Sequence, residues 1–147
     1  MDPAPALPPS LLDLTTYLLA QTGRRARARL AERLAERELR LWHYSILTAL
    51  ADFGPHVQRE LAERLGIDPS DIVRLLDELS RAGLVERARS AADRRRIQVS
   101  LTPVGLAALT ELRGIAAAVQ DEVLAPLGAT EREQLHGMLL RVHAAQR

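Results

Sequence analysis

Apolar residues recur at every third or fourth position along most of this chain, which is the period of a helix with one buried face. The spacing predicts a long helix over residues 11–36, a second over 39–53, and two short ones over 57–65 and 69–81. A further helix is expected over 104–124, and a capping box at Thr130–Glu133 predicts where a last one begins. Glycine and proline fall between these segments, as they commonly do at helix ends. We therefore expect a chain dominated by helix.

One short region departs from the helical period. Ile97, Val99 and Leu101 alternate with polar residues, which is the pattern of a strand with one buried face. A second strand-like run, LVERARS, occupies residues 84–90, and the two runs are separated by the basic segment AADRRR at 91–96. The predicted fold class is therefore mostly α with a small β-ribbon.

The predicted helix over 69–81 has a clear start and an apolar back. Asp68 has the position of an N-cap, Pro69 stands in the first turn, and Asp71 stands where a capping-box acid belongs. The apolar face consists of Ile72, Leu75, Leu76 and Leu79. Two short helices joined by a turn at Gly66, followed by a ribbon with a basic loop, form the outline of a winged helix-turn-helix, which indicates double-stranded DNA as the target.

The polar front of this helix would then enter the major groove. Candidate DNA-reading residues are Pro69, Ser70, Asp71, Val73 and Arg74. Arg74 is suited to a bidentate contact with guanine or to a phosphate, and Ser70 to a base edge or a phosphate oxygen. Asp71 could accept a hydrogen bond from a cytosine amino group, or it could serve as a cap. The alternative is that this helix only packs a core and that its charges are solvated.

The ribbon adds positive charge where a wing would meet the minor groove. Residues 81–96 hold six arginines against two acids, a local net charge of +4, whereas the whole chain carries only +1. Candidate wing residues are Asp93, Arg94, Arg95 and Arg96, with Arg87 and Arg89 as flanking phosphate contacts. Arginine is favoured in narrow minor grooves because they concentrate negative potential, and Asp93 could hold a neighbouring arginine in position. A solvated charged turn is the alternative.

Composition excludes several kinds of chemistry. The chain has no cysteine and no lysine, so it has no disulfide, no thiolate nucleophile, no Walker A loop and no Schiff-base lysine. No GxGxxG, HExxH or nucleophile-elbow motif occurs. The four histidines lack HxxxH spacing. We expect neither an enzyme nor a cofactor nor a metal site.

The sequence gives no indication of a membrane protein. No apolar run reaches the roughly 18–20 residues of a membrane span, and residues 1–10 lack the features of a signal peptide. Proline-rich residues 1–10 are expected to form a flexible arm. We expect a cytoplasmic protein without a membrane partner.

From about Leu39 to Leu112 these residues resemble the MarR (multiple antibiotic resistance regulator) family of bacterial regulators. The resemblance is carried by LxxRLGIDPSDIVRLLDELSRAGLVER, by Asp93-Arg94-Arg95, and by the sequence LTPVG at 101–105. It implies that Arg95 inserts into the minor groove and that Asp93 positions it. The chain departs from the family at Pro69, Asp71 and Val73, where relatives often carry arginine, threonine, and serine or threonine. These departures are expected to change which operator is bound and to leave DNA binding itself intact.

The resemblance also implies a homodimer built from the terminal helices of two chains. Residues 11–38 would form an N-terminal dimerisation helix, 39–102 a DNA-binding lobe, and 103–147 the C-terminal dimerisation helices, all within one structural domain. The leucines of the terminal helices have no predicted sheet to cover them, which favours a second copy. The helix over 69–81 would be the recognition helix of each chain. The two recognition helices of a dimer would require a pseudo-palindromic DNA site with half-sites about 10 bp apart.

Many members of this family bind small aromatic acids or lipophilic compounds in a cleft between dimer helices and the DNA-binding lobe. The resemblance puts part of that cleft near Arg40, Trp42, His43 and Tyr44. Trp42 could stack on a ligand, His43 could bind a carboxylate, and Arg40 could supply charge. The alternative is that the aromatic residues only fill the core or an interface.

Together these features predict a homodimeric transcriptional repressor that a small molecule releases from DNA. The competing hypothesis is a winged-helix module for protein interaction or DNA architecture, without sequence-specific DNA binding. Five acids near the expected DNA face favour it, since without compensation they would repel phosphate: Glu60, Glu63, Asp71, Asp77 and Glu78.

Overall fold

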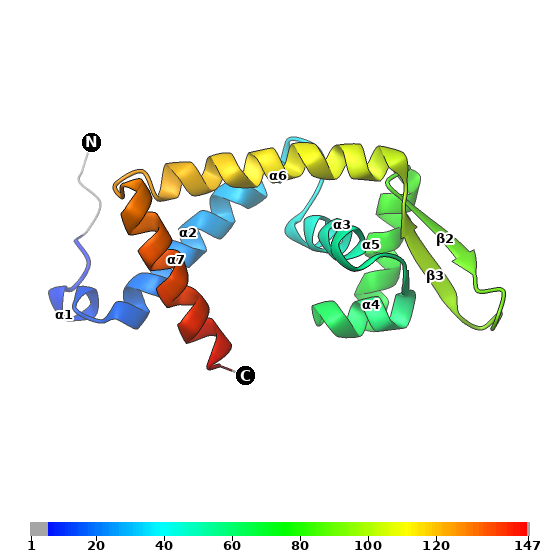
Figure 1. Cartoon of the computed structure of the whole chain (residues 1–147), viewed down its shortest axis with the longest axis horizontal. Helices are drawn as coiled ribbons and strands as arrows, with labels where there is room; N and C mark the ends of the chain where they lie inside the picture. Colours follow the sequence, from blue (N-terminus) through cyan, green and yellow to red (C-terminus); the bar gives the residue numbers. More distant parts are fainter. Residues whose placement is uncertain (1–5, 147) are drawn as a thin grey trace. The chain divides into compact units, whose positions relative to one another are not determined.

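The computed structural model describes residues 6–146 of the chain, which are mostly helical, as Figure 1 shows. The described elements are α1 (Pro9–Leu12), α2 (Thr15–Ala35), α3 (Leu41–Phe53), β1 (His56–Val57), α4 (Gln58–Leu65), α5 (Pro69–Arg81), β2 (Val85–Arg89), β3 (Ile97–Leu101), α6 (Pro103–Val123) and α7 (Ala129–Ala144). The predicted fold class, mostly α with a small β component, is confirmed. None of the described helices is long and apolar enough to cross a membrane.

The chain divides into two compact units. One contains the described residues up to Arg29 together with those from Ala117 onward, and the other, which we call the lobe, is Leu30–Ala116. Of the expected flexible arm, residues 1–5 lie outside the described residues, residues 6–8 have no regular structure, and Pro9 already begins α1.

The sheet of the lobe has one more strand than the sequence pattern predicts. Among the described residues it is antiparallel with the order β1-β3-β2, so β3 lies between the other two strands. Val85 pairs with Leu101 at one end of β2 and Arg89 with Ile97 at the other, while His56 pairs with Val99 on the opposite edge of β3. Two residues are too few to show a period of two, and this is why β1 was not predicted.

The core of the lobe is built from the apolar faces that the helical period identifies. Ile72, Leu75, Leu76 and Leu79 of α5 are all buried, as predicted. They pack in one cluster with residues of the neighbouring elements, including Leu47, Leu61, Val99 and Leu109. This packing fixes the back of α5 in the lobe and leaves its opposite face to solvent.

The start of α6 is held against the strand region by Thr102 and Gly105. The Thr102 hydroxyl donates to the Gly83 carbonyl at 2.6 Å and accepts from the Gly105 N–H at 2.9 Å, so Thr102 acts as the N-cap of α6. A Cβ at residue 105 would overlap the carbonyl oxygen of Leu84 and lie 2.9 Å from a methyl group of Leu101. Glycine is therefore required at position 105 for this close approach.

Two predicted helix starts are wrong. The helix expected over 11–36 is interrupted at Asp13-Leu14, because aspartate favours turns and caps over helix interiors. The next helix, α2, starts after this break, and its first bond runs from the Leu18 N–H to the Leu14 carbonyl. The last helix begins at Ala129, and the Glu131 carboxylate accepts from the Gly128 N–H at 3.0 Å. The capping acid is therefore Glu131, and Thr130 lies inside the first turn.

Candidate nucleic-acid interface

The turn between α4 and α5 is fixed by backbone geometry and a side-chain cap. Gly66 has φ 69°, a left-handed conformation that suits glycine, and the Ile67 N–H donates to the Ala62 carbonyl at 2.9 Å. Asp68 then caps α5, because its Oδ1 accepts from the Ser70 N–H at 2.9 Å and from the Ser70 hydroxyl at 2.6 Å. These two bonds lower the pKa of Asp68 below its ordinary value, so the cap stays ionised.

All five candidate DNA-reading residues of α5 lie on its exposed face: Pro69, Ser70, Asp71, Val73 and Arg74. The Arg74 guanidinium lies 3.2 Å from the Asp71 carboxylate, so Asp71 pairs with Arg74 instead of closing the expected capping box. Because the Ser70 hydroxyl already donates its proton to Asp68, its oxygen offers lone pairs to an incoming donor. The front of α5 thus presents a guanidinium, a hydroxyl acceptor and the apolar Val73.

The wing is a hairpin of β2 and β3 whose tip is fixed by hydrogen bonds to the backbone. Asp93 Oδ1 accepts from the Arg95 N–H at 3.0 Å, and the Asp93 carbonyl accepts from the Arg96 N–H at 3.0 Å. The Arg95 side chain is 93% exposed, with its Nε 3.5 Å from Asp93. Arg94 is also exposed. The turn therefore holds Arg95 out from the tip, in the arrangement that a groove-inserting arginine needs.

The two flanking arginines hold parts of the lobe together. Arg87 of β2 reaches back to Asp77 of α5 at 2.5 Å, which links the wing to the recognition helix. Arg89 donates to the Arg94 carbonyl at 2.8 Å and so supports the tip. Both were predicted as phosphate contacts; in this structure their guanidinium groups are engaged within the protein.

Each of the five acids that favoured the interaction-module hypothesis has a cationic partner. The pairs are Glu60–Arg96 at 3.1 Å, Glu63–Arg59 at 3.8 Å, Asp71–Arg74 at 3.2 Å, Asp77–Arg87 at 2.5 Å and Glu78–Arg40 at 2.7 Å. Such pairs between exposed groups are weak, with a median near 0–1 kcal/mol, so an arginine can exchange its carboxylate for a phosphate at small cost.

A buried histidine joins α3 to the recognition helix. His43 is 2% exposed, and its Nδ1 accepts from the Arg40 backbone N–H at 2.9 Å. The proton of the neutral ring is therefore on Nε2, which donates to Glu78 Oε2 at 2.8 Å. Arg40 Nη2 donates to both oxygens of the same carboxylate. Burial lowers the pKa of His43, and the Arg40 hydrogen bond lowers the pKa of Glu78, so a neutral imidazole faces a carboxylate.

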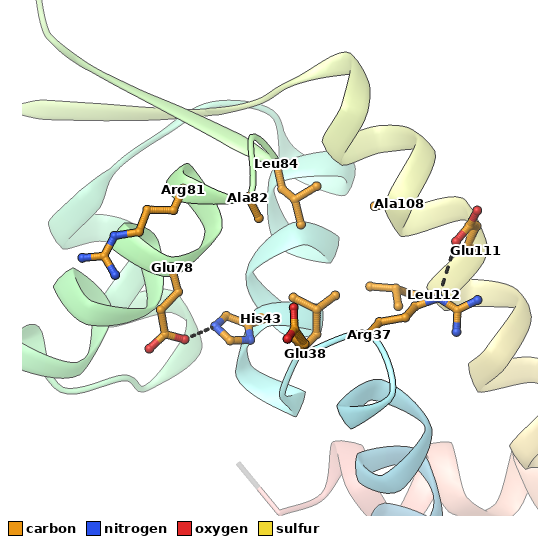
Figure 2. Close-up of a pocket in the computed structure, with 11 residues that line it drawn as sticks. Arg37, Glu38, His43, Glu78, Arg81, Ala82, Leu84, Ala108, Glu111 and Leu112 are labelled. Atoms are coloured by element: carbon orange, nitrogen blue, oxygen red, sulfur yellow. Dashed lines mark hydrogen bonds and ion pairs between the residues drawn. The ribbon is translucent and has the colours of Figure 1, made fainter.

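His43 and Glu78 form one wall of a cavity of about 450 Å³ within the lobe, shown in Figure 2. Its apolar lining comes from Leu39, Ala82, Leu84, Ala108 and Leu112, and further charged side chains line it as well: Arg37, Glu38, Arg81 and Glu111. Arg37 Nε lies 3.5 Å from Glu111. An apolar hollow with a few charged groups suits a small amphipathic molecule.

Of the four residues predicted for a ligand site, the structure places only His43 in this cavity. The Trp42 side chain is 42% exposed, Tyr44 packs against the core, and the Arg40 side chain is engaged by Glu78. The other lining residues come from three separate segments of the sequence, so no local pattern could have assembled them. Within residues 6–146, no group of three or more potential ligands could hold a metal ion.

Comparisons with known proteins agree with this geometry. The profile of the MarR family matches residues 38–96. A probable transcriptional regulator from Pseudomonas aeruginosa is 32% identical, with 90% of this chain and 98% of that chain covered and a TM-score of 0.74. The transcriptional repressor CouR, solved bound to a 23-mer DNA duplex, is 29% identical, with 95% and 99% covered and a TM-score of 0.80. Bordetella bronchiseptica BpsR, whose DNA binding is regulated by 6-hydroxynicotinic acid, is similar in fold at 22% identity, with 95% and 98% covered and a TM-score of 0.73.

Proposed function

This chain belongs to the MarR family of DNA-binding transcriptional regulators, and on that premise we propose that it is a homodimeric repressor released from a pseudo-palindromic operator by a small molecule. It is a regulator and not an enzyme. The observation that carries the proposal is that one lobe combines a recognition helix, with buried back and exposed front, and a wing with an outward arginine.

In the proposed complex, α5 lies in the major groove and the wing tip in the adjacent minor groove. Arg74 leaves Asp71 to contact guanine or a phosphate, and the Ser70 oxygen accepts from a base amino group. Arg95 enters the minor groove while Asp93 keeps the turn in shape. CouR, which is 29% identical and has a similar fold, is bound to a DNA duplex, and this supports duplex DNA as the partner of the lobe.

The competing interaction-module hypothesis loses the feature that favoured it. Its support was a set of acids that would repel phosphate, and each of these acids is paired with an arginine or, in one case, with an arginine and a histidine. A surface of such pairs is close to neutral, and its arginines can exchange a carboxylate for a phosphate of a polyanion. This favours DNA as the partner of the lobe.

A second copy of the chain is the proposed cover for the apolar residues outside the lobe. The exposed apolar side chains of α1, α2 and α7 include Leu11, Leu12, Leu18, Leu19, Met138, Leu139, Leu140 and Val142. Single exposed leucines need no explanation, but a series of them on adjacent turns is typical of an interface. A symmetric dimer would cover these residues and present two recognition helices to one operator.

The cavity beside His43 and Glu78 is the proposed effector site. In the described part of the chain, the Arg81 side chain, which lines the cavity, has no ion-pair or hydrogen-bond partner. A molecule with an apolar body and an acidic group would satisfy both this cation and the apolar lining. Ligand binding there would act on α5 directly, since Glu78 and Arg81 both belong to that helix.

Fluorescence anisotropy tests the proposed function. The purified protein is titrated against the intergenic DNA upstream of its own gene and, in parallel, against a scrambled duplex, at several salt concentrations. We expect tight binding to the first duplex only, with an affinity that falls steeply as salt rises. Equally weak binding to every duplex, including those from a random-sequence selection, would contradict the proposal.

A further inference from the structure

His43 is a buried, ionisable side chain of the lobe that takes no part in the proposed DNA surface. It stands in the first turn of α3, where its Nδ1 accepts from the Arg40 backbone N–H at 2.9 Å and so caps that helix. Its Nε2 donates to Glu78 Oε2 at 2.8 Å, in the last turn of α5, as Figure 2 shows. Both ring nitrogens are therefore engaged, one by the start of α3 and the other by the recognition helix.

Glu78 attaches the C-terminal end of the recognition helix to α3. Its carboxylate accepts from His43 and from the Arg40 guanidinium, which donates to both of its oxygens. Glu78 lies one turn after Arg74, so the two side chains leave the same face of α5. Because one helical turn is stiff, a movement of α5 at Glu78 also moves Arg74, the proposed contact to guanine.

A second proton on His43 has no place in this arrangement. The neutral ring carries its proton on Nε2, so a further proton must go to Nδ1, toward which the Arg40 backbone N–H already points. Two N–H groups that face each other cannot form a hydrogen bond, and the helix cap is lost. The charged ring must therefore turn away from Arg40, and because the ring is rigid, the bond to Glu78 is lost with it.

Burial and the surrounding charges decide how readily the ring takes that proton. Burial lowers the pKa of His43, Glu78 raises it, and the charges of Arg40 and Arg74 lower it again, with a net decrease below 6.5. The cavity that the ring borders is lined by further charged side chains from the α2–α3 connection, α5 and α6, two of each sign: Arg37, Glu38, Arg81 and Glu111. The neutral ring therefore prevails at pH 7, and the charged ring is reached only under acid conditions.

We propose that His43 is a positioning residue for DNA binding, whose neutral ring holds the recognition helix in place through Glu78 and whose protonated ring releases it. The inference rests on the proposed DNA-binding function and adds control by protons to it. DNA affinity should then fall as the pH decreases. By linkage, bound DNA must oppose protonation of the ring to the same degree, and so lower the pKa of His43 further.

The direction of that second effect is diagnostic. DNA is a polyanion, and negative charge raises the pKa of a histidine that merely lies near it. A positioning role predicts the opposite, a lower pKa of His43 in the complex than in the free protein. A histidine that only fills the core would show neither a lowered pKa on DNA binding nor an effect on affinity.

The first measurement is fluorescence anisotropy of full-length wild type and His43→Gln on one specific duplex, at constant salt, from pH 7 to pH 5. Glutamine in the first turn can accept from the Arg40 N–H as a capping-box residue, can donate to Glu78 and does not titrate. We expect wild-type affinity to fall by about fivefold or more, a typical coupling between two sites, and His43→Gln to keep its affinity. The matched control is His136→Gln, an exposed histidine of α7, which should follow wild type.

The second measurement needs no variant. Wild-type protein labelled with ¹³C and ¹⁵N in histidine is titrated by NMR, free and bound to the duplex. The tautomer identifies the resonance of His43, whose proton is on Nε2, whereas the proton of buried His56 is on Nδ1, from which it donates to the Gly54 carbonyl. We expect a lower pKa of His43 in the complex.

The outcomes separate this role from the proposed function. A loss of affinity at acid pH in wild type and His136→Gln but not in His43→Gln, with a lowered pKa in the complex, supports the proposal. An equal loss in His43→Gln, or a pKa of His43 that DNA raises or leaves unchanged, would overturn it while DNA binding at pH 7 stands. If the wild-type protein binds no duplex at pH 7, both this role and the proposed function fail.

Discussion

Helices α5 and α7 have similar apolar content but differ in what covers them. In α5 the four periodic apolar residues are all buried within the lobe. In α7, which belongs to the other unit, no residue is buried, and Met138, Leu139, Leu140 and Val142 are all exposed. The apolar face of α5 is satisfied by its own chain, whereas the face of α7 has no cover among the described residues.

This difference separates what the chain specifies alone from what it leaves to a partner. The lobe buries its apolar faces in one cluster that its own residues form. The other unit has exposed apolar side chains on α1, α2 and α7, which the proposed second copy would cover. We therefore expect mutations in the lobe core to change its unfolding free energy and mutations on α7 to change the oligomeric state.

The largest expected effect is that of Leu76→Ala in the lobe. Leu76 is fully buried in the core cluster, and truncation of such a leucine leaves a cavity that costs about 2–5 kcal/mol of unfolding free energy. Trp42 is the only tryptophan of the chain and lies on α3, so its fluorescence during urea unfolding reports on this lobe. We expect a lower urea midpoint at every protein concentration.

The counterpart is Leu140→Ala on α7, where the side chain is 56% exposed. Here we expect the oligomeric state to change, with dissociation at higher protein concentration in sedimentation velocity, while the Trp42 transition at high concentration stays near wild type. If the two regions differ as described, Leu76→Ala changes only the unfolding free energy of the lobe and Leu140→Ala changes only the oligomeric state. The distinction between the regions would be wrong if Leu140→Ala lowered the unfolding free energy of the lobe as much as Leu76→Ala does.

Local pattern predicted the parts of the fold that are long or regularly spaced. The limits of α5, its buried face and the two strands of the wing follow from a period, a capping residue or a proline. Strand β1 was missed because two residues carry no period, and the break at Asp13-Leu14 was missed because the apolar spacing continues across it. Capping by Glu131 was missed because a glycine N-cap has no side-chain signature.

A smaller loss of stability is expected from a substitution at Gly105, where α6 meets the backbone of Leu84. A methyl group there would overlap the Leu84 carbonyl, which also accepts from the Thr102 N–H, so neither partner can move freely. Gly105→Ala should therefore lower the unfolding free energy by about 1–3 kcal/mol, as overpacking does. The measurement is again urea unfolding followed by Trp42 fluorescence.

Gly114 provides the control on the same helix. A Cβ at residue 114 would meet nothing within 4 Å, and alanine is the better helix former by roughly 0.5–1 kcal/mol. The same substitution should thus destabilise at position 105 and stabilise slightly at position 114. Destabilisation by both would indicate that α6 tolerates no change of helix propensity, and that the contact with Leu84 is not the cause.

The candidate site was predictable only where its residues are neighbours in sequence. The front of α5 and the Asp93–Arg96 turn are continuous segments, and the structure exposes them as expected. The cavity beside Glu78 combines residues from 37 to 112. Sequence spacing contains no information on which distant charged residues meet, so their pairing with acids could not be foreseen.

The smallest expected effect is the pH dependence that His43 contributes. Burial lowers the pKa of His43 below 6.5, against the opposing influence of Glu78 and with the aid of the Arg40 and Arg74 charges. At a pH below about 6.5 the unfolded chain therefore binds a proton that the folded lobe resists. The stability of the wild-type lobe should fall as pH decreases from 7 to 5. The pKa of Glu78 is lowered from 4.5, so its contribution is lost only at a more acidic pH.

His43→Gln should flatten this dependence, since glutamine does not titrate and its amide can still donate to Glu78. The matched control is His136→Gln, which removes an exposed histidine of α7. The check is the unfolding free energy of each protein at several values between pH 7 and pH 5. An unaltered slope in His43→Gln would mean that the buried ring is not the proton-linked group. A flattened slope would show that the lobe encloses a titrating group, His43, that is bonded to Glu78 of α5.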